Sequence, residues 1–397
     1  MEPYSITDTQ TEKLAILPKH QQLFIGIPRE GSLQDNRVAL IPNSIATLTA
    51  HGHRIVVESG AGKQARFTDN DFSEAGAKVV HSAEEVFKAD VLLMVAPPTH
   101  EEIQMMRPNQ VVISPIHLPL MDAEYITLLQ KKRVIALAME YIQDDENGDF
   151  PIVRVMSELA GTSAILIAAE LLSTARGGMG VLLGGIAGVP PAKVIILGAG
   201  VVAEYASRTA VGLGAEVRIF DNNVYKLMRL QKHVGRQLYT SVVNPTYLRE
   251  QLLTADVAIG AVHSPHARTP MLVSEDIVKQ MKPGSVIVDV SIDQGGCFES
   301  STPTTHEKPS FLKHGVTHYC VPNIPSRVAR TASEAISNIL TSLLIKAENG
   351  GVLPLITQHK GLRNGVYTYK GCLTNEYLGE RFQIKSTSLD LLITSDF

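Results

Sequence analysis

The stretch Val194–Ala206, which reads VIILGAGVVAEYA, decides how this chain is expected to fold. A run of β-branched residues ends at Gly198-Ala199-Gly200, and a helix-like segment follows. Gly198 permits a tight turn, Gly200 lets a pyrophosphate approach the backbone, and Ala203 allows close packing of helix on strand. The motif therefore predicts a strand–turn–helix unit with a dinucleotide's phosphates at the helix N-terminus.

An acidic residue at the expected distance supports this interpretation. Asp221 follows the first glycine by about 20 residues, at the end of the next apolar run, where a carboxylate can accept hydrogen bonds from ribose hydroxyls. It would repel a 2′-phosphate, and the following Asn222 and Asn223 supply no arginine to compensate. The sequence predicts NAD rather than NADP. A structural turn without a ligand is the alternative, and the context and spacing favour the cofactor.

Strand-like and helix-like segments alternate on both sides of the motif. Before it, short apolar runs are separated by segments of helical period, and they lie at 23–28, 54–57, 91–95, 111–117 and 134–139. After the motif the same alternation restarts. β-branched runs that alternate with helices are typical of parallel sheets covered on both faces. We expect an α/β protein with two doubly wound parallel-sheet domains, the second a Rossmann NAD-binding domain, and an active-site cleft between them.

The expected domain boundaries follow from this alternation. Residues 1–22 form an N-terminal extension, either partly ordered or an arm that grips a neighbouring subunit. Residues 152–330 form the NAD-binding domain. Residues 331–397 are too few to bury a core of their own, so we expect them to pack on 23–151 and complete the substrate domain.

Composition excludes several classes of protein. The 397 residues include 36 Lys and Arg against 40 Asp and Glu, a net charge of −4, so nucleic acid and anionic membranes are not expected partners. Apolar residues make up 44%, which is not the composition of a disordered chain. The segment 159–172 is short for a membrane span and is interpreted as a buried helix.

Cysteine and histidine usage indicates the compartment and argues against a metal site. Three scattered cysteines provide neither a disulfide framework nor a zinc site, namely Cys297, Cys320 and Cys372. Their scarcity, and an N-terminus that resembles neither a signal nor a transit peptide, predict a cytoplasmic protein. His81, His100 and His117 lie on separate elements without ligand spacing, so no metal is expected.

Three groups able to do chemistry lie where strands are expected to end. Arg37 lies in the loop after the first strand, His117 ends the run VVISPIH, and Asp293 follows VIVDVSID. A guanidinium can hold a carboxylate, an imidazole can exchange protons near neutrality, and a carboxylate can orient water. These residue types alone leave other roles open: a surface ion pair, a core histidine and a turn cap.

Several longer segments resemble the alanine dehydrogenase family, which is related to the NAD-binding subunit of proton-translocating transhydrogenase. They are GIPREGSLQDNRVALIP (26–42), MSELAG (156–161), LGAGVVA (197–203), MKPGSVIVDVSIDQGGCFESSTPTT (281–305) and YCVPNIPSRVARTAS (319–333). The resemblance implies a two-domain α/β enzyme, commonly hexameric. It would interconvert L-alanine and pyruvate, releasing or consuming ammonia, with NAD as the hydride acceptor or donor.

The resemblance also assigns roles to individual residues. Arg37 matches the arginine that holds the substrate carboxylate, His117 the catalytic histidine, and Asp293 the catalytic aspartate near the nicotinamide. Asp221 matches the ribose ligand. Three more residues match positions close to the cofactor, namely Ser157, Lys226 and Asn323.

One departure from the family pattern concerns the substrate. The family usually has lysines at two positions where this chain has Met94 and Ala96, and the second lysine contacts the substrate. Losing such a contact commonly costs on the order of 2–4 kcal/mol of transition-state stabilisation. The apolar pair would also enlarge the pocket wall and favour a bulkier substrate.

Three explanations for the departure stay open. A basic group from elsewhere could replace the lysine, and the candidates are Arg29, Lys63, Arg66 and His100. The substrate could be another 2-oxo or 2-amino acid. The chain could also be an NAD(H)-binding relative that has lost catalysis. A transhydrogenase-type hydride donor is a weaker alternative, because no membrane segment accompanies the domains.

Overall fold

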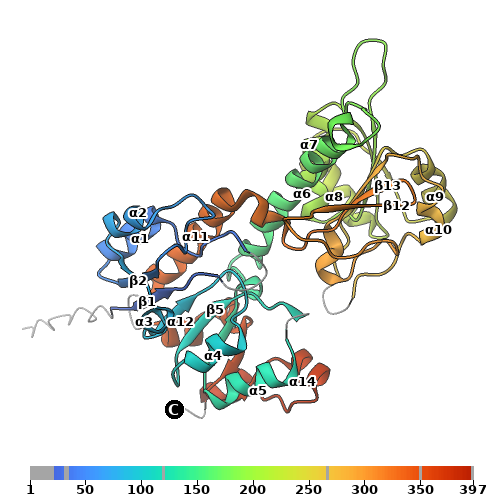
Figure 1. Ribbon diagram of the computed structural model, residues 1–397. Coiled ribbons are helices and arrows are strands. Elements are labelled where there is room, and N and C mark those ends of the chain that lie inside the picture. Colours follow the sequence, from blue (N-terminus) through green and yellow to red (C-terminus); the bar gives the residue numbers. More distant parts are fainter. Residues whose placement is uncertain (1–21, 31–34, 119–120, 265–267, 348–350, 395–397) are drawn as a thin grey trace, which may run out of the picture.

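The computed structural model describes residues 22–30, 35–118, 121–264, 268–347 and 351–394. Two lobes, each with a sheet at its centre, are joined by α6 (Pro151–Leu172), and α11 (Ala329–Lys346) packs on the sheet of the first lobe (Figure 1). The prediction of a doubly wound α/β fold with two sheets is confirmed. The predicted extension at 1–22 lies outside the described residues except for its last residue.

The first sheet contains strands from both the N-terminal and the C-terminal parts of the described chain. Its strand order is β15-β14-β6-β5-β4-β1-β2-β3, and all neighbours are parallel except that β14 is antiparallel to both β6 and β15. The bounds are β1 Phe24–Ile27, β2 Arg54–Glu58, β3 Lys78–Val80, β4 Val91–Leu93, β5 Val111–Ser114, β6 Ile135–Ala138, β14 Val366–Tyr369 and β15 Cys372–Leu373. The C-terminal segment thus extends the sheet that the N-terminal segment begins.

Both faces of this sheet are buried, which explains why its strands are continuous apolar runs. In β4, Val91 and Leu93 belong to the core cluster that contains Ile336 of α11. Leu92 points to the other face and belongs to a cluster with Tyr125, from α5 (Ala123–Lys131). Helices therefore cover the sheet on both sides.

The second sheet has the order β12-β13-β11-β10-β7-β8-β9. It is parallel except for the antiparallel pair of β12 and β13 at its edge. The bounds are β7 Lys193–Leu197, β8 Glu216–Phe220, β9 Tyr239–Ser241, β10 Val257–Gly260, β11 Val286–Asp289, β12 Ser310–Lys313 and β13 Val316–Tyr319. The edge strand β12 was not anticipated, because only its central residues are apolar and its residues are partly exposed.

The helices agree with the predicted alternation, with shifted ends. Helix α6 begins at Pro151, ahead of the segment 159–172 that was interpreted as a buried helix, because proline is well tolerated in the first turn. One helix of the second alternation, α10, is short and spans Glu275–Val278. The others are α1 Pro42–Ala50, α2 Asp69–Glu74, α3 Ala83–Val86, α4 His100–Met105, α7 Val201–Gly212, α8 Val224–Val234, α9 Pro245–Leu253, α12 Val352–Gln358, α13 Lys360–Arg363, α14 Glu376–Phe382 and α15 Leu389–Thr394, with 3-10 turns η2 Met139–Tyr141, η3 Thr174–Arg176, η4 Val290–Gln294 and η5 Ile324–Val328.

Strand order locates the two places where a ligand is expected. In the first sheet the order reverses between β1 and β4, and in the second between β7 and β10. Open α/β sheets bind ligands beyond the carboxyl ends of their strands, at such reversals. The loops that follow these four strands are therefore the parts of the chain to inspect.

Helix α6 connects the lobes and is the one described helix long and apolar enough to resemble a membrane span. It packs against α7, α11, η5 and β11. Gly161 permits the close approach of α7, since a Cβ there would lie 2.9 Å from the backbone nitrogen of Ala206. These contacts are those of a core helix, as the sequence predicted.

Candidate active site

The glycine turn after β7 has the geometry that the sequence predicted. Gly198 has a φ of +105°, and a Cβ there would lie 2.8 Å from the carbonyl carbon of Ala261, which follows β10. Gly200 caps α7 without a side-chain hydrogen bond, and a Cβ on it would meet no atom within 4 Å. Ala203, in the first turn of α7, is fully buried. The turn thus leaves space and uncapped N–H groups, which fit a pyrophosphate.

Asp221 holds this turn together from the end of β8. One carboxylate oxygen accepts a hydrogen bond from the backbone nitrogen of Ala199 at 2.7 Å, and the other from that of Asn223 at 2.7 Å. Each oxygen keeps a second lone pair, so ribose hydroxyls could still be bound. Lys226 lies in the first turn of α8, where its backbone nitrogen donates to the Asn223 side chain.

Arg37 is buried in the loop between β1 and α1, not on the surface. Its backbone nitrogen and Nε donate to Oδ1 of Asp35 at 3.0 and 2.9 Å, and Nη2 donates to Oδ2. Nη2 also donates to the carbonyl of Val95 at 3.1 Å, and Nη1 contacts Sδ of Met156 at 3.3 Å. Ser157 follows Met156 in α6. The guanidinium therefore lies where the β1 and β4 loops meet the helix between the lobes.

Asn323 connects Asp35, the partner of Arg37, to the second domain. Its side-chain Nδ2 donates to Asp35, and its backbone nitrogen donates to Oδ1 of Asp293 at 3.2 Å. Asn323 has a φ of +59°, in the left-handed region that asparagine tolerates better than most residues. Arg37, Asp35, Asn323 and Asp293 thus form one connected group across the two domains.

Asp293 lies in η4, at the carboxyl end of β11. Solvent reaches this residue, yet the surrounding protein displaces enough water to raise the pKa of its carboxyl group to about 6. The hydrogen bond from Asn323 and the charge of Arg37 act in the opposite direction and lower that pKa. A carboxylate with these properties can orient water and exchange a proton near neutrality.

His117 also follows the carboxyl end of a strand of the first sheet, but it lies apart from this group. It follows β5, the neighbour of β4, and burial lowers its pKa below the usual value. Among the described residues, no hydrogen bond or ion pair joins His117 to Arg37 or Asp293. Its imidazole is therefore neutral near pH 7 and able to accept a proton.

Glu140, in η2 after β6, fixes the loop that carries His117. Its Oε1 accepts a hydrogen bond from the backbone nitrogen of Ile116 at 2.6 Å. Its Oε2 is buried without a partner in the described part of the chain. Burial raises the pKa of this carboxyl group to about 8, so Glu140 is mostly protonated at neutral pH.

The replacement Glu140→Gln is expected to change how stability depends on pH. The folded-state pKa exceeds the unfolded one, so the folded protein binds more protons between about pH 4.5 and 8, and its unfolding free energy falls as pH rises through that window. Glutamine removes this titration. Between pH 5 and 8 the unfolding free energy of the wild type should therefore fall by roughly 3 kcal/mol more than that of the variant. Urea unfolding from pH 5 to 8 measures it, with exposed Glu146→Gln as the control. Parallel profiles for Glu140→Gln and the wild type would contradict the assignment.

The two positions that depart from the family pattern are both fully buried. Met94 packs in the core beneath the sheet, so the expectation that it enlarges the substrate pocket is wrong. Ala96 is likewise inaccessible. Instead, Glu30 accepts hydrogen bonds from the backbone nitrogens of Val95 at 2.6 Å and Ala96 at 3.2 Å. Burial raises the pKa of Glu30 well above its usual value.

The four suggested replacements for the missing lysine do not contact Arg37 or Asp293 in the described structure. Arg29 is 66% exposed at its side chain and lies near Glu58. His100 lies 3.5 Å from Asp122 and packs on another ring. The other two candidates are exposed, namely Lys63 and Arg66.

Sequence reasoning missed several groups that shape the site. Asp35 lies two residues before Arg37, and Glu30 lies three residues after the end of β1, so acidic residues near a predicted strand end were the available signal. Burial lowers the pKa of His306, and the charges of Asp35, which raises it, and Arg37, which lowers it, also act on this imidazole. Its Nε2 is buried without a partner among the described residues.

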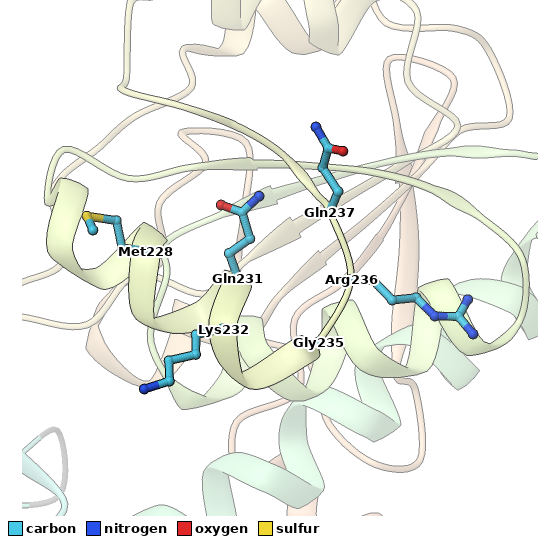
Figure 2. A pocket seen from close by; sticks show the side chains of 6 residues that line it. All are labelled: Met228, Gln231, Lys232, Gly235, Arg236 and Gln237. Carbon is cyan, nitrogen blue, oxygen red and sulfur yellow. The ribbon is translucent and has the colours of Figure 1, made fainter.

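Two surface hollows lie outside the connected group. Figure 2 shows one of about 430 Å³ at the end of α8, lined by Met228, Gln231, Lys232, Gly235, Arg236 and Gln237. It includes none of the predicted site residues. Another of about 350 Å³ adjoins the contact between the domains and is lined by Asn36, Gln64, Ser326, Val328, Ala329, Thr331 and three arginines, Arg66, Arg327 and Arg330. Its basic lining would attract an anion towards the site.

Comparison with known proteins agrees with this architecture. The family profile described as "Alanine dehydrogenase/PNT, N-terminal domain" matches residues 26–160, and the corresponding C-terminal domain matches 164–376. The chain belongs to the alanine dehydrogenase/PNT family. The resemblance noted in the sequence is thereby confirmed.

Named relatives of this family align along almost the whole chain. Alanine dehydrogenase 2 of Staphylococcus aureus (strain USA300) is 39% identical over 368 residues, covering 92% of this chain and 98% of that protein. A solved L-alanine dehydrogenase superposes with a TM-score of 0.85 at 38% identity, covering 90% of this chain and 99% of that one. A transhydrogenase from Sinorhizobium meliloti gives 0.76 at 26% identity, covering 89% and 99%.

Proposed function

We propose that the chain catalyses the reversible oxidative deamination of L-alanine to pyruvate and ammonia, with NAD as the hydride acceptor. The observation that carries the proposal is the connected group of Arg37, Asp35, Asn323 and Asp293, which spans the two domains of an alanine dehydrogenase/PNT family member. Relatives of 38–39% identity are named for this activity.

NAD is the cofactor that fits the second domain. Gly198 and Gly200 leave room for the pyrophosphate, Ala203 keeps α7 close to the sheet, and Asp221 would bind the ribose and repel a 2′-phosphate. Three further residues are proposed to lie along the cofactor, namely Ser157, Lys226 and Asn323. When bound, the nicotinamide ring accepts the hydride from the Cα of the substrate.

The substrate residues act from both sides of the contact between the domains. Arg37 receives the carboxylate of the amino acid, and the neutral imidazole of His117 accepts the proton that the amine must lose. Asp293 holds the water that hydrolyses the substrate imine. These roles need a pocket that closes around alanine, with His117 brought towards Arg37 by the substrate.

Other features of the working enzyme belong to the same proposal. We expect a cytoplasmic homo-oligomer, a hexamer as in the family, that acts on a small amino or 2-oxo acid. We assign the substrate domain to 23–151 with 331–397 and the cofactor domain to 152–330. Among the described residues, no group of three or more His, Cys, Asp and Glu is placed to hold a metal ion.

A second candidate function follows from Ala96, which provides no charged group at the position of the family lysine. The chain could bind NAD(H) and act on another amino acid, or have lost catalysis. This alternative differs from the first in the substrates that support turnover.

An assay of NAD reduction tests the proposal. We expect the purified protein to reduce NAD with L-alanine, more efficiently than with serine, 2-aminobutyrate or glycine, and to discriminate against NADP by roughly 100-fold or more through Asp221. The variant Asp221→Asn can still accept a hydrogen bond from the backbone of the glycine turn. It should reduce the preference for NAD over NADP. Tight NADH binding without turnover of any of the four amino acids would favour the second candidate.

A further inference from the structure

Asp35 forms an ion pair with Arg37, the arginine that is expected to hold the substrate. Its side chain and that of Arg37 are both buried, each residue being 8% exposed. Both oxygens of Asp35 are used, because Oδ1 accepts from Nε of Arg37 and Oδ2 accepts from Nη2 and from Asn323. A carboxylate already lies on one side of the guanidinium before any substrate arrives.

The hydrogen-bond inventory of Arg37 shows what is left for a ligand. A guanidinium has five N–H groups. Nε and one Nη2 hydrogen point to Asp35, the other Nη2 hydrogen points to the carbonyl of Val95, and one Nη1 hydrogen points to Met156. Only one N–H, on Nη1, has no partner among the described residues. Arg37 therefore cannot form a bidentate pair with a substrate carboxylate while its other hydrogen bonds are kept.

The same aspartate also links the two domains. Asn323 donates to Asp35 through its side chain and to Asp293 through its backbone. A neighbouring link also joins the domains without touching Arg37, since the backbone nitrogen of Asn36 donates to Oγ of Ser326 at 2.9 Å. The second link, unlike the first, makes no contact with the guanidinium among the described hydrogen bonds.

We propose that Asp35 is a positioning residue that makes substrate binding depend on the cofactor domain. It orients Arg37 so that the substrate carboxylate is received through Nη1, and its bond to Asn323 ties that orientation to the loop beside Asp293. Movement of this loop when the cofactor binds is thereby transmitted to Arg37. The inference rests on the proposed function for the identity of the substrate.

Binding measurements without turnover test this coupling. The dissociation constant of NADH is measured by its fluorescence, with and without saturating pyruvate, in the absence of ammonium. In the wild type, pyruvate is expected to tighten NADH binding by at least about fivefold. In Asp35→Asn this factor should fall below about twofold, while NADH binding without pyruvate stays within roughly threefold of the wild type.

Two further variants complete the test. Ser326→Ala removes the neighbouring link and is expected to keep the wild-type coupling, whereas Asp35→Glu should restore part of it. If Asp35→Asn does not fold, Asn323→Gly removes the same link, keeps the left-handed backbone and should lose the coupling.

The inference and the proposed function can fail separately. A wild type in which pyruvate does not affect NADH binding would overturn the inference, and so would Asp35→Asn with full coupling. A protein that shows the coupling but does not oxidise alanine would instead overturn the proposed function.

Discussion

Replacing Gly198 with alanine is expected to abolish dinucleotide binding and to destabilise the second domain. The new Cβ would lie 2.8 Å from the carbonyl carbon of Ala261, and the backbone there has a φ of +105°. Backbone atoms cannot move aside as a flexible side chain would. We expect a loss of roughly 2–5 kcal/mol in the free energy of unfolding. Thermal unfolding and NADH fluorescence titration measure the two effects.

Gly200→Ala is the matched variant that separates binding from folding. Its φ is ordinary and a Cβ would meet no protein atom within 4 Å, so stability should stay within about 1 kcal/mol of the wild type. The methyl group would fill the space reserved for the pyrophosphate, and the Kd for NADH should rise by about 10- to 100-fold. Unchanged NADH binding would show that the phosphates do not lie against this turn.

Replacing Arg37 with methionine is expected to reduce both stability and activity. Asp35 would lose its counterion while it stays buried, and breaking a buried pair from one side typically costs about 3–5 kcal/mol. The substrate carboxylate would lose a charge-assisted hydrogen bond, so kcat/KM for L-alanine should fall by about 100-fold or more. Denaturant unfolding and steady-state kinetics measure the two losses.

The double variant Arg37→Met/Asp35→Asn distinguishes these contributions. Removing the unpaired charge should restore about half or more of the lost stability, because the penalty comes mainly from an uncompensated buried carboxylate. Activity should not return, since the cation is still absent. A single variant as stable as the wild type would contradict the assignment of this stability loss to an uncompensated Asp35 carboxylate.

The fold was predictable because its local signals agree with one another. The motif 194–206 forms the strand, glycine turn and helix that were predicted from it. The alternating apolar runs correctly indicated two sheets covered on both faces. The edge strand β12 was missed because its residues are only partly buried, so they lack the apolar pattern of a central strand.

The candidate site was predictable only in part. Arg37, His117 and Asp293 were selected by their residue types and by their position after strands, and the structure places each in the segment that follows such a strand. Their mutual contacts did not follow from the sequence. Asp35 attracted no attention because an acid two residues from an arginine ordinarily indicates an exposed pair.

By itself, the sequence determined the class of fold and the place of the dinucleotide turn, because backbone conformation and apolar periodicity are local properties of the chain. Only the tertiary structure decided that Asp35 neutralises Arg37, that Asn323 connects it to Asp293, and that Met94 and Ala96 are buried. One of these contacts joins residues almost 300 positions apart, namely Asp35 and Asn323. Burial and hydrogen-bond partners at that separation depend on how the two domains pack, which no short stretch of sequence contains.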